Sequence, residues 1–184
     1  MPNLEYLGLL LFNVMAREDC PRDYQWCYYG AQDLLINRVS IPRFFSQETA
    51  PPGTTGYCCE ATCMVDDERW RHGERLTDWI IDDLVKVGLI RNRRNVEDVR
   101  IERIPESYPV YRANYSDELD RARKLLSGFS NFHLAGRTAL FWYNNMDHSI
   151  ENATHLAGRL IRDSMSAGGA VRDSGCLPPH LAVL

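Results

Sequence analysis

Four strand-like runs, separated by turns, occupy the first third of this 184-residue chain. They lie at residues 4–15, 26–29, 38–41 and 56–64, and the turn before the last run contains Pro51, Pro52 and Gly53. Apolar, aromatic and β-branched runs bounded by such turn residues are typical of strands. Strands that follow one another through turns pair in opposite directions. The sequence therefore predicts a mostly antiparallel sheet.

Amphipathic segments predict helices that pack on this sheet. The first helix begins at Thr77 as N-cap and ends at Gly88, and its apolar stripe comprises Trp79, Ile80, Leu84, Val85 and Val87. Asp82 and Asp83 fall on its polar face, where solvation is the ordinary explanation. A short strand follows at residues 99–104, and Pro105 and Pro109 prevent its continuation as a helix.

Two further helices and a strand are expected in the C-terminal part. One helix begins at Ser116 and ends at Gly128, with a stripe of Leu119, Ala122, Leu125 and Leu126. Residues 132–135 indicate a buried strand. The last helix runs from 147 to 164, with an apolar face of Ile150, Ala153, Leu156, Leu160 and Ile161. The fold class is thus α+β, ending in a strand-helix unit, and the tail at residues 166–184 is expected to be disordered.

Composition and charge narrow the classes of function. The net charge of -4 provides no basic surface for nucleic acid, and residues 91–94 are best explained as a solvated turn. The longest apolar run, residues 7–12, is far shorter than the roughly 20 residues of a membrane-spanning helix. Glu5 argues against a signal peptide. A cytoplasmic protein without a membrane span is expected.

No pattern of metal ligands is present. The six cysteines contain no C-x-x-C pair, so buried free thiols are the expected state. The histidines lack the spacing of an H-E-x-x-H site. We therefore predict no metal site.

The segment from residue 136 to residue 150 carries the most chemistry. Gly136 and Arg137 are followed by three aromatic residues at 141–143, and a helix begins shortly afterwards. The first N–H groups of a helix lack internal partners and carry partial positive charge, so they can face an anion or a ring that becomes anionic on reduction. In the alternative interpretation, Asp147 only caps the helix and the aromatic residues are core. Pattern alone favours this second interpretation.

The order of residues in this segment resembles a known flavin-binding segment. Gly136-Arg137, Tyr143, Asn145 and Asp147-His148-Ser149 before a helix are similar to the C-terminal segment of the FAD-dependent amine oxidase, protoporphyrinogen oxidase and UDP-galactopyranose mutase superfamily. Upstream runs fall in the order of the substrate domains of mutase-like members: Trp26-Cys27-Tyr28-Tyr29, Asn37-Arg38-Val39, Phe45-Ser46, Ala50-Pro51-Pro52-Gly53 and Tyr108-Pro109. The resemblance covers residues 4 to about 161.

The resemblance implies a domain organisation and a set of site residues. Residues 1–115 would form a substrate-binding domain, and residues 116–165 would complete a Rossmann-like FAD domain. The residues expected beside FAD are Gly136, Arg137, Met146, Asp147, His148, Ser149 and Ile150. The residues expected at the substrate are Arg38, Tyr108, Tyr143 and Asn145, with Arg38 placed like the arginine that grips the substrate pyrophosphate in eukaryotic-type mutases. No catalytic residue is assigned, and His148 is as well explained by a structural hydrogen bond.

The resemblance leaves three possible functions, and each must account for the lack of a phosphate-binding loop in this chain. The chain contains no Gly-x-Gly-x-x-Gly phosphate loop, so FAD binding would require an N-terminal dinucleotide-binding half in cis or in trans. The leading expectation is the C-terminal portion of an FAD-dependent oxidoreductase that transfers a hydride from an organic substrate to flavin N5. The alternative is a mutase-like isomerase of a nucleotide sugar that uses reduced flavin, although Thr138 replaces the glycine usual in mutases. The third is a non-catalytic substrate-cap or partner module.

Overall fold

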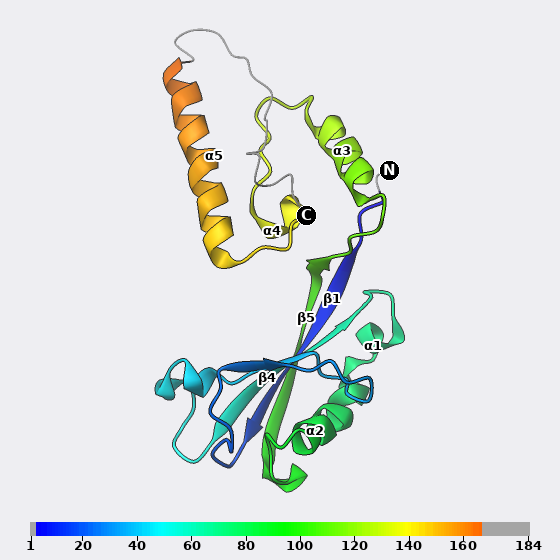
Figure 1. Cartoon of the computed structure of the whole chain (residues 1–184), viewed down its shortest axis with the longest axis vertical. Helices are drawn as coiled ribbons and strands as arrows, with labels where there is room; N and C mark the ends of the chain where they lie inside the picture. The colour runs from blue at the N-terminus through cyan, green and yellow to red at the C-terminus, as the bar shows by residue number, and fades with distance from the viewer. Residues whose placement is uncertain (1–2, 167–184) are drawn as a thin grey trace. The chain divides into compact units, whose positions relative to one another are not determined.

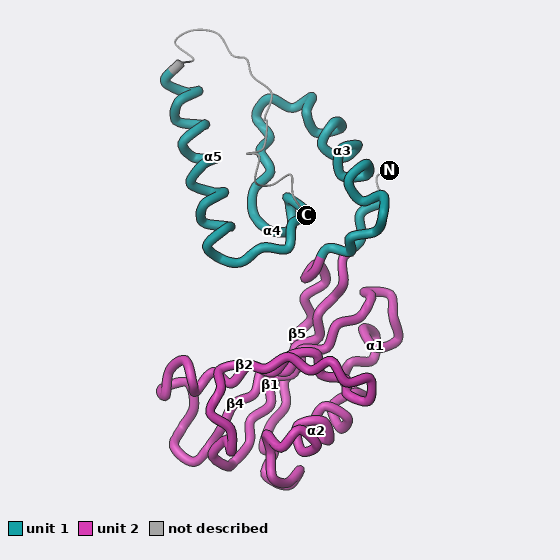
Figure 2. The backbone as a smooth tube through the Cα atoms, viewed as in Figure 1, with its two compact units in different colours: residues 1–5, 109–184 teal, residues 6–108 magenta. Residues whose placement is uncertain are grey.

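The computed structural model describes residues 3–166 of the chain, and these divide into two compact units (Figure 2). We call residues 6–108 the sheet unit, and residues 3–5 with 109–166 the helical unit. Each unit is described by itself. Residues 167–184 of the predicted tail, with Cys176 and His180, lie outside the described residues.

The sheet unit is built on five strands in the order β2-β3-β4-β1-β5 (Figure 1). Their bounds are β1 Tyr6–Ala16, β2 Trp26–Tyr28, β3 Arg38–Ser40, β4 Thr55–Cys63 and β5 Val96–Pro109. The pairs β1–β4, β2–β3 and β3–β4 are antiparallel. The predicted α+β class with an antiparallel sheet is therefore confirmed.

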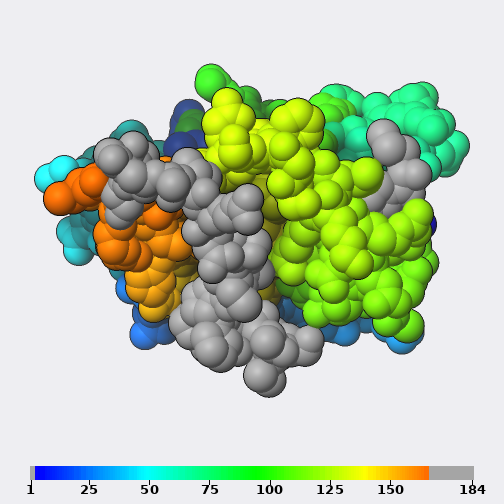
Figure 3. Space-filling view, turned by 90° about the horizontal axis from the view of Figure 1, so that it is seen from above, coloured from blue at the N-terminus to red at the C-terminus, as the bar shows by residue number. Residues whose placement is uncertain are grey.

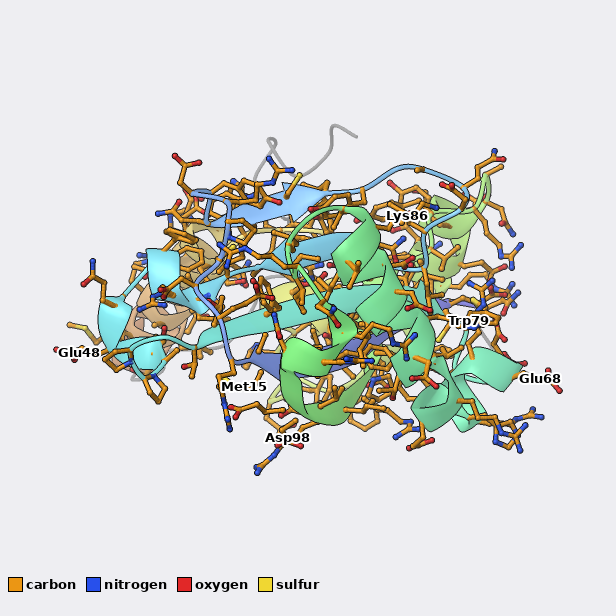
Figure 4. The ribbon with its side chains drawn as sticks, turned by 90° about the horizontal axis from the view of Figure 1, so that it is seen from below. Met15, Glu48, Glu68, Trp79, Lys86 and Asp98 are labelled. Atoms are coloured by element: carbon orange, nitrogen blue, oxygen red, sulfur yellow. The ribbon has the colours of Figure 1, made fainter. Side chains whose placement is uncertain are left out.

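Helical turns connect and cover these strands. The α-helices are α1 Glu68–Arg71 and α2 Thr77–Lys86, and the 3₁₀ turns are η1 Pro42–Phe44, η2 Gln47–Thr49, η3 Gly73–Leu76 and η4 Arg93–Asn95. Helix α2 lies across the strands when the sheet is viewed from below (Figure 4). It ends as predicted, because Gly88 adopts a φ of 72° that favours glycine.

Alternation along the strands creates one buried face. Strand β1 contributes Leu10, Phe12 and Val14, and β4 contributes Tyr57 and Cys59. Helix α2 closes this core with Ile80 and Leu84. The core is completed by a hydrogen bond in which the Tyr57 hydroxyl donates to the backbone oxygen of Leu89 at 2.6 Å. Because side chains alternate along a strand, the residues between these core positions occupy the opposite face of the sheet.

The helical unit contains α3 Tyr115–Leu126, α4 Gly136–Ala139 and α5 Met146–Ser166. Helix α4 contacts α5 (Figure 1). The described residues of the unit bury few apolar side chains, among them Leu119, Leu140 and Phe141. The predicted helices are present, but the apolar residues of their stripes do not pack into a closed core.

Several sequence predictions are corrected. Residues 132–135 form no strand, and Phe132 is 52% exposed. Strand β5 is longer than predicted and includes Pro105, because an edge strand does not need every N–H group for pairing.

Trp79 is exposed on α2 (Figure 4), so the buried stripe comprises its neighbours Ile80, Ile81 and Leu84. Helices α2 and α3 begin one residue away from the predicted first residues, with Leu76 and Asn114 at the N-caps.

Asp83 is also corrected, because its side chain is buried and not solvated. Its Oδ2 atom accepts hydrogen bonds from the backbone N–H groups of Leu35, at 2.6 Å, and Ile36, at 3.1 Å. The carboxylate thus fastens the segment before β3 to helix α2. Asp82 does lie at the surface, where it pairs with Arg93.

Candidate functional site

The predicted site residues fall into two groups, one in each unit. The sheet unit holds Arg38 and Tyr108, and the helical unit holds the remaining nine: Gly136, Arg137, Tyr143, Asn145, Met146, Asp147, His148, Ser149 and Ile150. Each group is built below from its own contacts.

Two hydrogen bonds hold the first turn of α5. Most backbone N–H groups of this turn remain at the N-terminal end of the helix. The backbone N–H of Asn145 donates to Nδ1 of His148 at 3.3 Å, and the N–H of Ser149 donates to the Asn145 oxygen at 3.1 Å. This places the His148 ring as a cap, in the manner of a capping box. The geometry thus shows the structural hydrogen bond that was considered for His148. The N–H groups of residues 146–148 remain as the positive end of a 21-residue helix.

Asn144 lies beside this turn and carries a donor without a partner. The residue is 4% exposed, and its Oδ1 atom accepts a hydrogen bond from the Ser149 hydroxyl at 3.2 Å. Its Nδ2 atom is buried and has no hydrogen-bond partner among the described residues. A buried unpaired donor is unfavourable by about 1–3 kcal/mol. The end of α5 is therefore a place where an acceptor on a ligand would gain a bond.

Arg137 is tied to the same loop. Its Nη1 atom donates to the backbone oxygen of Asn144 at 2.7 Å, and its guanidinium carbon lies 4.4 Å from the centroid of the Tyr143 ring. Gly136 has a φ of 80°, which starts the short helix α4 that carries Arg137. The structure thus brings Arg137, Tyr143 and the start of α5 together.

Aromatic packing supports the loop between α4 and α5. The Tyr111 hydroxyl accepts a hydrogen bond from the Tyr143 backbone N–H at 2.7 Å, and the Tyr111 ring meets the Phe141 ring edge-on at 5.9 Å. Phe141 has a φ of 51°, a left-handed conformation that is uncommon outside glycine. The Trp142 and His148 rings lie 5.2 Å apart. Sequence analysis missed Tyr111 and Asn144, because their partners lie across a loop without periodicity.

The side chains that follow this loop are open. Met146 is 83% exposed and Ile150 is 67% exposed. Figure 3 shows a space-filling view of one face of the helical unit, in green to orange. Further exposed apolar side chains of this unit are Leu125, Phe129, Phe132, Ile161 and Met165.

The second group centres on Glu60, which sequence analysis did not select. Arg38 on β3 and Glu60 on β4 are opposite each other in the strand register, and their side chains form an ion pair. The Tyr108 hydroxyl donates to Glu60 Oε2 at 3.1 Å, and Arg38 Nη1 donates to the Tyr28 hydroxyl at 3.3 Å. Arg38 and Tyr108 are therefore brought together, by a carboxylate that lies between them.

Burial and charge oppose each other at Arg38. Desolvation acts to lower the pKa of Arg38, but the hydrogen bonds to Tyr28 and Glu60 and the Glu60 charge outweigh it, and the pKa is raised above its ordinary value. The guanidinium is firmly cationic. Glu60 could have been noticed from the sequence as a lone carboxylate inside the alternating strand at 56–64.

The described residues offer no metal centre and no membrane helix. Within residues 3–166, no group of three His, Cys, Asp or Glu side chains is arranged to share a metal ion. None of the helices in that range has the length and apolar character needed to cross a bilayer. The five described cysteines are free, and burial raises the pKa of the Cys59 thiol.

Comparison with solved structures identifies the fold. A reduced UDP-galactopyranose mutase superposes with a TM-score of 0.71 and 17% identity, over 85% of this chain and 34% of the mutase. A protein of Exiguobacterium sp. 255-15, assigned as a protoporphyrinogen oxidase, superposes with a TM-score of 0.65 and 15% identity, over 86% of this chain and 35% of that protein. No family model matches the sequence. No curated protein matches it either.

The chain has the fold of part of these proteins. The sequence resemblance to the superfamily that contains them is confirmed at the level of fold. The chain spans about a third of the length of these structures.

Proposed function

We propose that this chain is the C-terminal portion of an FAD-dependent oxidoreductase, in which the start of α5 holds the flavin ring. The observation that carries the proposal is the open end of α5 with the unpaired Nδ2 donor of Asn144 beside it. The pyrimidine edge of a flavin presents acceptor atoms and gains negative charge on reduction. Helix N–H groups and an amide donor suit that edge.

The residues of this chain would bind and orient the cofactor. The N–H groups of Met146, Asp147 and His148 would face the ring, with Ser149 and Ile150 continuing the turn. Arg137 fixes the loop through the Asn144 oxygen and adds a positive charge. The chemistry supplied by bound flavin is acceptance of a hydride at N5 from an organic substrate. Tyr143 and Asn145 would border the substrate, as would Arg38 and Tyr108 of the sheet unit.

A dinucleotide-binding half would complete the FAD domain, in cis or in trans. The coverage of about a third of each solved neighbour supports this part of the proposal. So do the exposed apolar side chains Met146, Ile150 and Ile161 on α5, which the described residues leave without a core. In a supplied half, a Gly-x-Gly-x-x-Gly loop would bind the pyrophosphate.

Flavin binding to the chain tests the proposal. We expect the chain assembled with a dinucleotide-binding half to bind reduced FAD more tightly than oxidised FAD, because the helix end favours negative charge. Replacing Asn144 with Ala should weaken the affinity for reduced FAD by about tenfold. Asn92→Ala is the matched control, since Asn92 caps the unrelated turn η4. Equal affinity of the wild type and Asn144→Ala would refute the placement of the ring.

A second candidate is a mutase-like isomerase, which the UDP-galactopyranose mutase neighbour favours. The oxidoreductase and the isomerase differ in whether the substrate reduces the flavin. This is measured on the chain assembled with a dinucleotide-binding half. Flavin reduction by the substrate supports the oxidoreductase. Turnover that requires pre-reduced flavin and consumes no oxidised acceptor supports the isomerase. If flavin is bound only when a dinucleotide-binding half is added and no turnover of any substrate follows, the non-catalytic module is supported.

A further inference from the structure

We propose that Glu60 is a specificity-determining residue, which masks Arg38 and makes this face of the sheet select an uncharged or cationic organic ligand over a diphosphate. The inference deepens the proposed function and rests on it only for the assignment of Arg38 to the substrate site. The contacts around Glu60 do not depend on the proposed function.

The two terminal nitrogens of the Arg38 guanidinium are bonded to protein groups, while its Nε is buried and has no partner among the described residues. Nη2 pairs with Glu60 Oε1, and Nη1 donates to the Tyr28 hydroxyl at 3.3 Å. A guanidinium binds a phosphate group through two parallel N–H bonds. Each terminal nitrogen of this fork makes one bond within the sheet, so a diphosphate that bound the fork would compete with Glu60 and Tyr28.

Displacing Glu60 is unfavourable because the carboxylate is buried and fixed from two sides. Its side chain is 6% exposed, against 31% for Arg38. The Tyr108 hydroxyl holds Oε2 while Arg38 holds Oε1. Without Arg38, the buried carboxylate would keep the Tyr108 hydroxyl but would lose the cation that balances its charge. The ion pair therefore persists when an anion approaches.

The local charge also opposes an anion. Arg38 and Glu60 cancel, and Glu102 of β5 adds a further negative charge nearby. Burial raises the pKa of the Cys58 thiol, the charges of Glu60 and Glu102 also raise it, and the charge of Arg38 lowers it. The paired charges of Arg38 and Glu60 therefore give a ligand with two negative charges no net attraction.

Aromatic surface next to the pair indicates what would bind instead. Trp26 and Tyr28 lie on the same face of β2, opposite Ser40 and Arg38 in the register. They are 49% and 63% exposed, although the Trp26 ring stacks on Phe45 and the Arg38 guanidinium carbon lies 5.7 Å from the centroid of the Tyr28 ring. Aromatic faces contact flat apolar groups and attract cations. The surface suits an organic molecule that is neutral or positively charged.

Direct binding to the 184-residue chain without flavin tests the inference. The probes are inorganic pyrophosphate and phenyltrimethylammonium, titrated by calorimetry. We expect the wild type to bind phenyltrimethylammonium more tightly than pyrophosphate. Glu60→Gln should raise the affinity for pyrophosphate by about tenfold or more, because Arg38 is released. The double variant Glu60→Gln with Arg38→Gln should lose that gain.

Glu97→Gln is the matched control. Glu97 pairs with Arg17 in the same sheet unit, but that arginine side chain is 77% exposed, so its release should create no pyrophosphate site. Wild-type binding of pyrophosphate that exceeds the binding of phenyltrimethylammonium and disappears in Arg38→Gln overturns the inference. So does a folded Glu60→Gln without the gain. If Glu60→Gln does not fold, the wild-type preference between the two probes decides. None of these results depends on flavin, so failure here is distinct from failure of the proposed function.

Discussion

The two units differ in how completely they bury their apolar residues. In the sheet unit, β1, β4 and α2 enclose fully buried side chains such as Phe12, Leu84 and Ile90. In the helical unit, α5 leaves Ile150 and Ile161 more than half exposed. Burial of apolar surface is the main favourable term in folding. The sheet unit therefore has the interior of an independent domain. The helical unit has exposed apolar surface that suits contact with another domain or protein.

The difference also divides the chemistry. In the sheet unit, Glu60 joins Arg38 and Tyr108 into one cluster, in which only the buried Nε of Arg38 has no partner among the described residues. In the helical unit, the buried Nδ2 of Asn144 has no such partner, and it lies beside the N-terminal end of α5.

The largest effect is expected from truncating a buried residue of the sheet unit, compared with an exposed residue of the helical unit. Phe12→Ala should lower the free energy of unfolding of the sheet unit by about 3–5 kcal/mol, because it leaves a cavity. Ile150→Ala should change the stability of the chain by less than about 0.5 kcal/mol. Urea unfolding followed by circular dichroism measures both. Equal losses would mean that α5 already has a core, and would break the comparison.

The next effect concerns the adjacent carboxylates of α2. Asp83→Ala should cost about 1–3 kcal/mol, because the N–H groups of Leu35 and Ile36 lose their acceptor. Asp82→Ala removes an exposed ion pair with Arg93 and should cost less than about 1 kcal/mol. Unfolding of the two variants under one set of conditions compares them. The reverse order would restore the solvated interpretation of Asp83.

A pH dependence is expected in the sheet unit alone. Burial raises the pKa of the Cys59 thiol and of the Tyr57 hydroxyl above their ordinary values. The unfolded chain therefore loses these protons at lower pH than the folded chain. The stabilisation is complete below the unfolded pKa of Cys, about 8.5, and declines as the pH rises above it. Urea unfolding at rising pH should show this decline, and Cys59→Ala should reduce it. A flat profile in the wild type would contradict the burial of these groups.

The smallest effect is expected at the cap of α5. His148→Ala removes the acceptor for the Asn145 N–H and should cost about 1 kcal/mol or less of helix stability. Amide hydrogen exchange of residues 146–149 detects the fraying. His155→Ala, within the same helix but away from its end, is the control. Unchanged exchange in His148→Ala would show that the ring does not cap the helix.

Much of the sheet unit could be predicted from the sequence. Alternation and turn residues located β1 to β4, and Gly88 located the end of α2. These signals are local, because they depend on the period of a strand or on the conformation of one residue. The partners of Asp83 and Glu60 were missed, since Leu35 and Arg38 reach them only through the tertiary fold.

The helical unit was predicted less well for a related reason. The apolar run at 132–135 indicated a strand, but the residues that the structure describes offer it no neighbouring strand, and it stays irregular and exposed. Resemblance located Arg137, Tyr143 and the start of α5. It did not locate Asn144, whose importance comes from burial and from an unpaired atom.

The central claim is that the N–H groups at the start of α5 hold a flavin ring. The most direct measurement is a ¹⁵N–¹H NMR titration with reduced FAD of the labelled chain assembled with a dinucleotide-binding half, followed at the amides of Met146, Asp147 and His148. The account predicts that these amides and the Asn144 side-chain amide shift most, and that oxidised FAD shifts them less. Shifts confined to other residues, or none at saturating FAD, would contradict it.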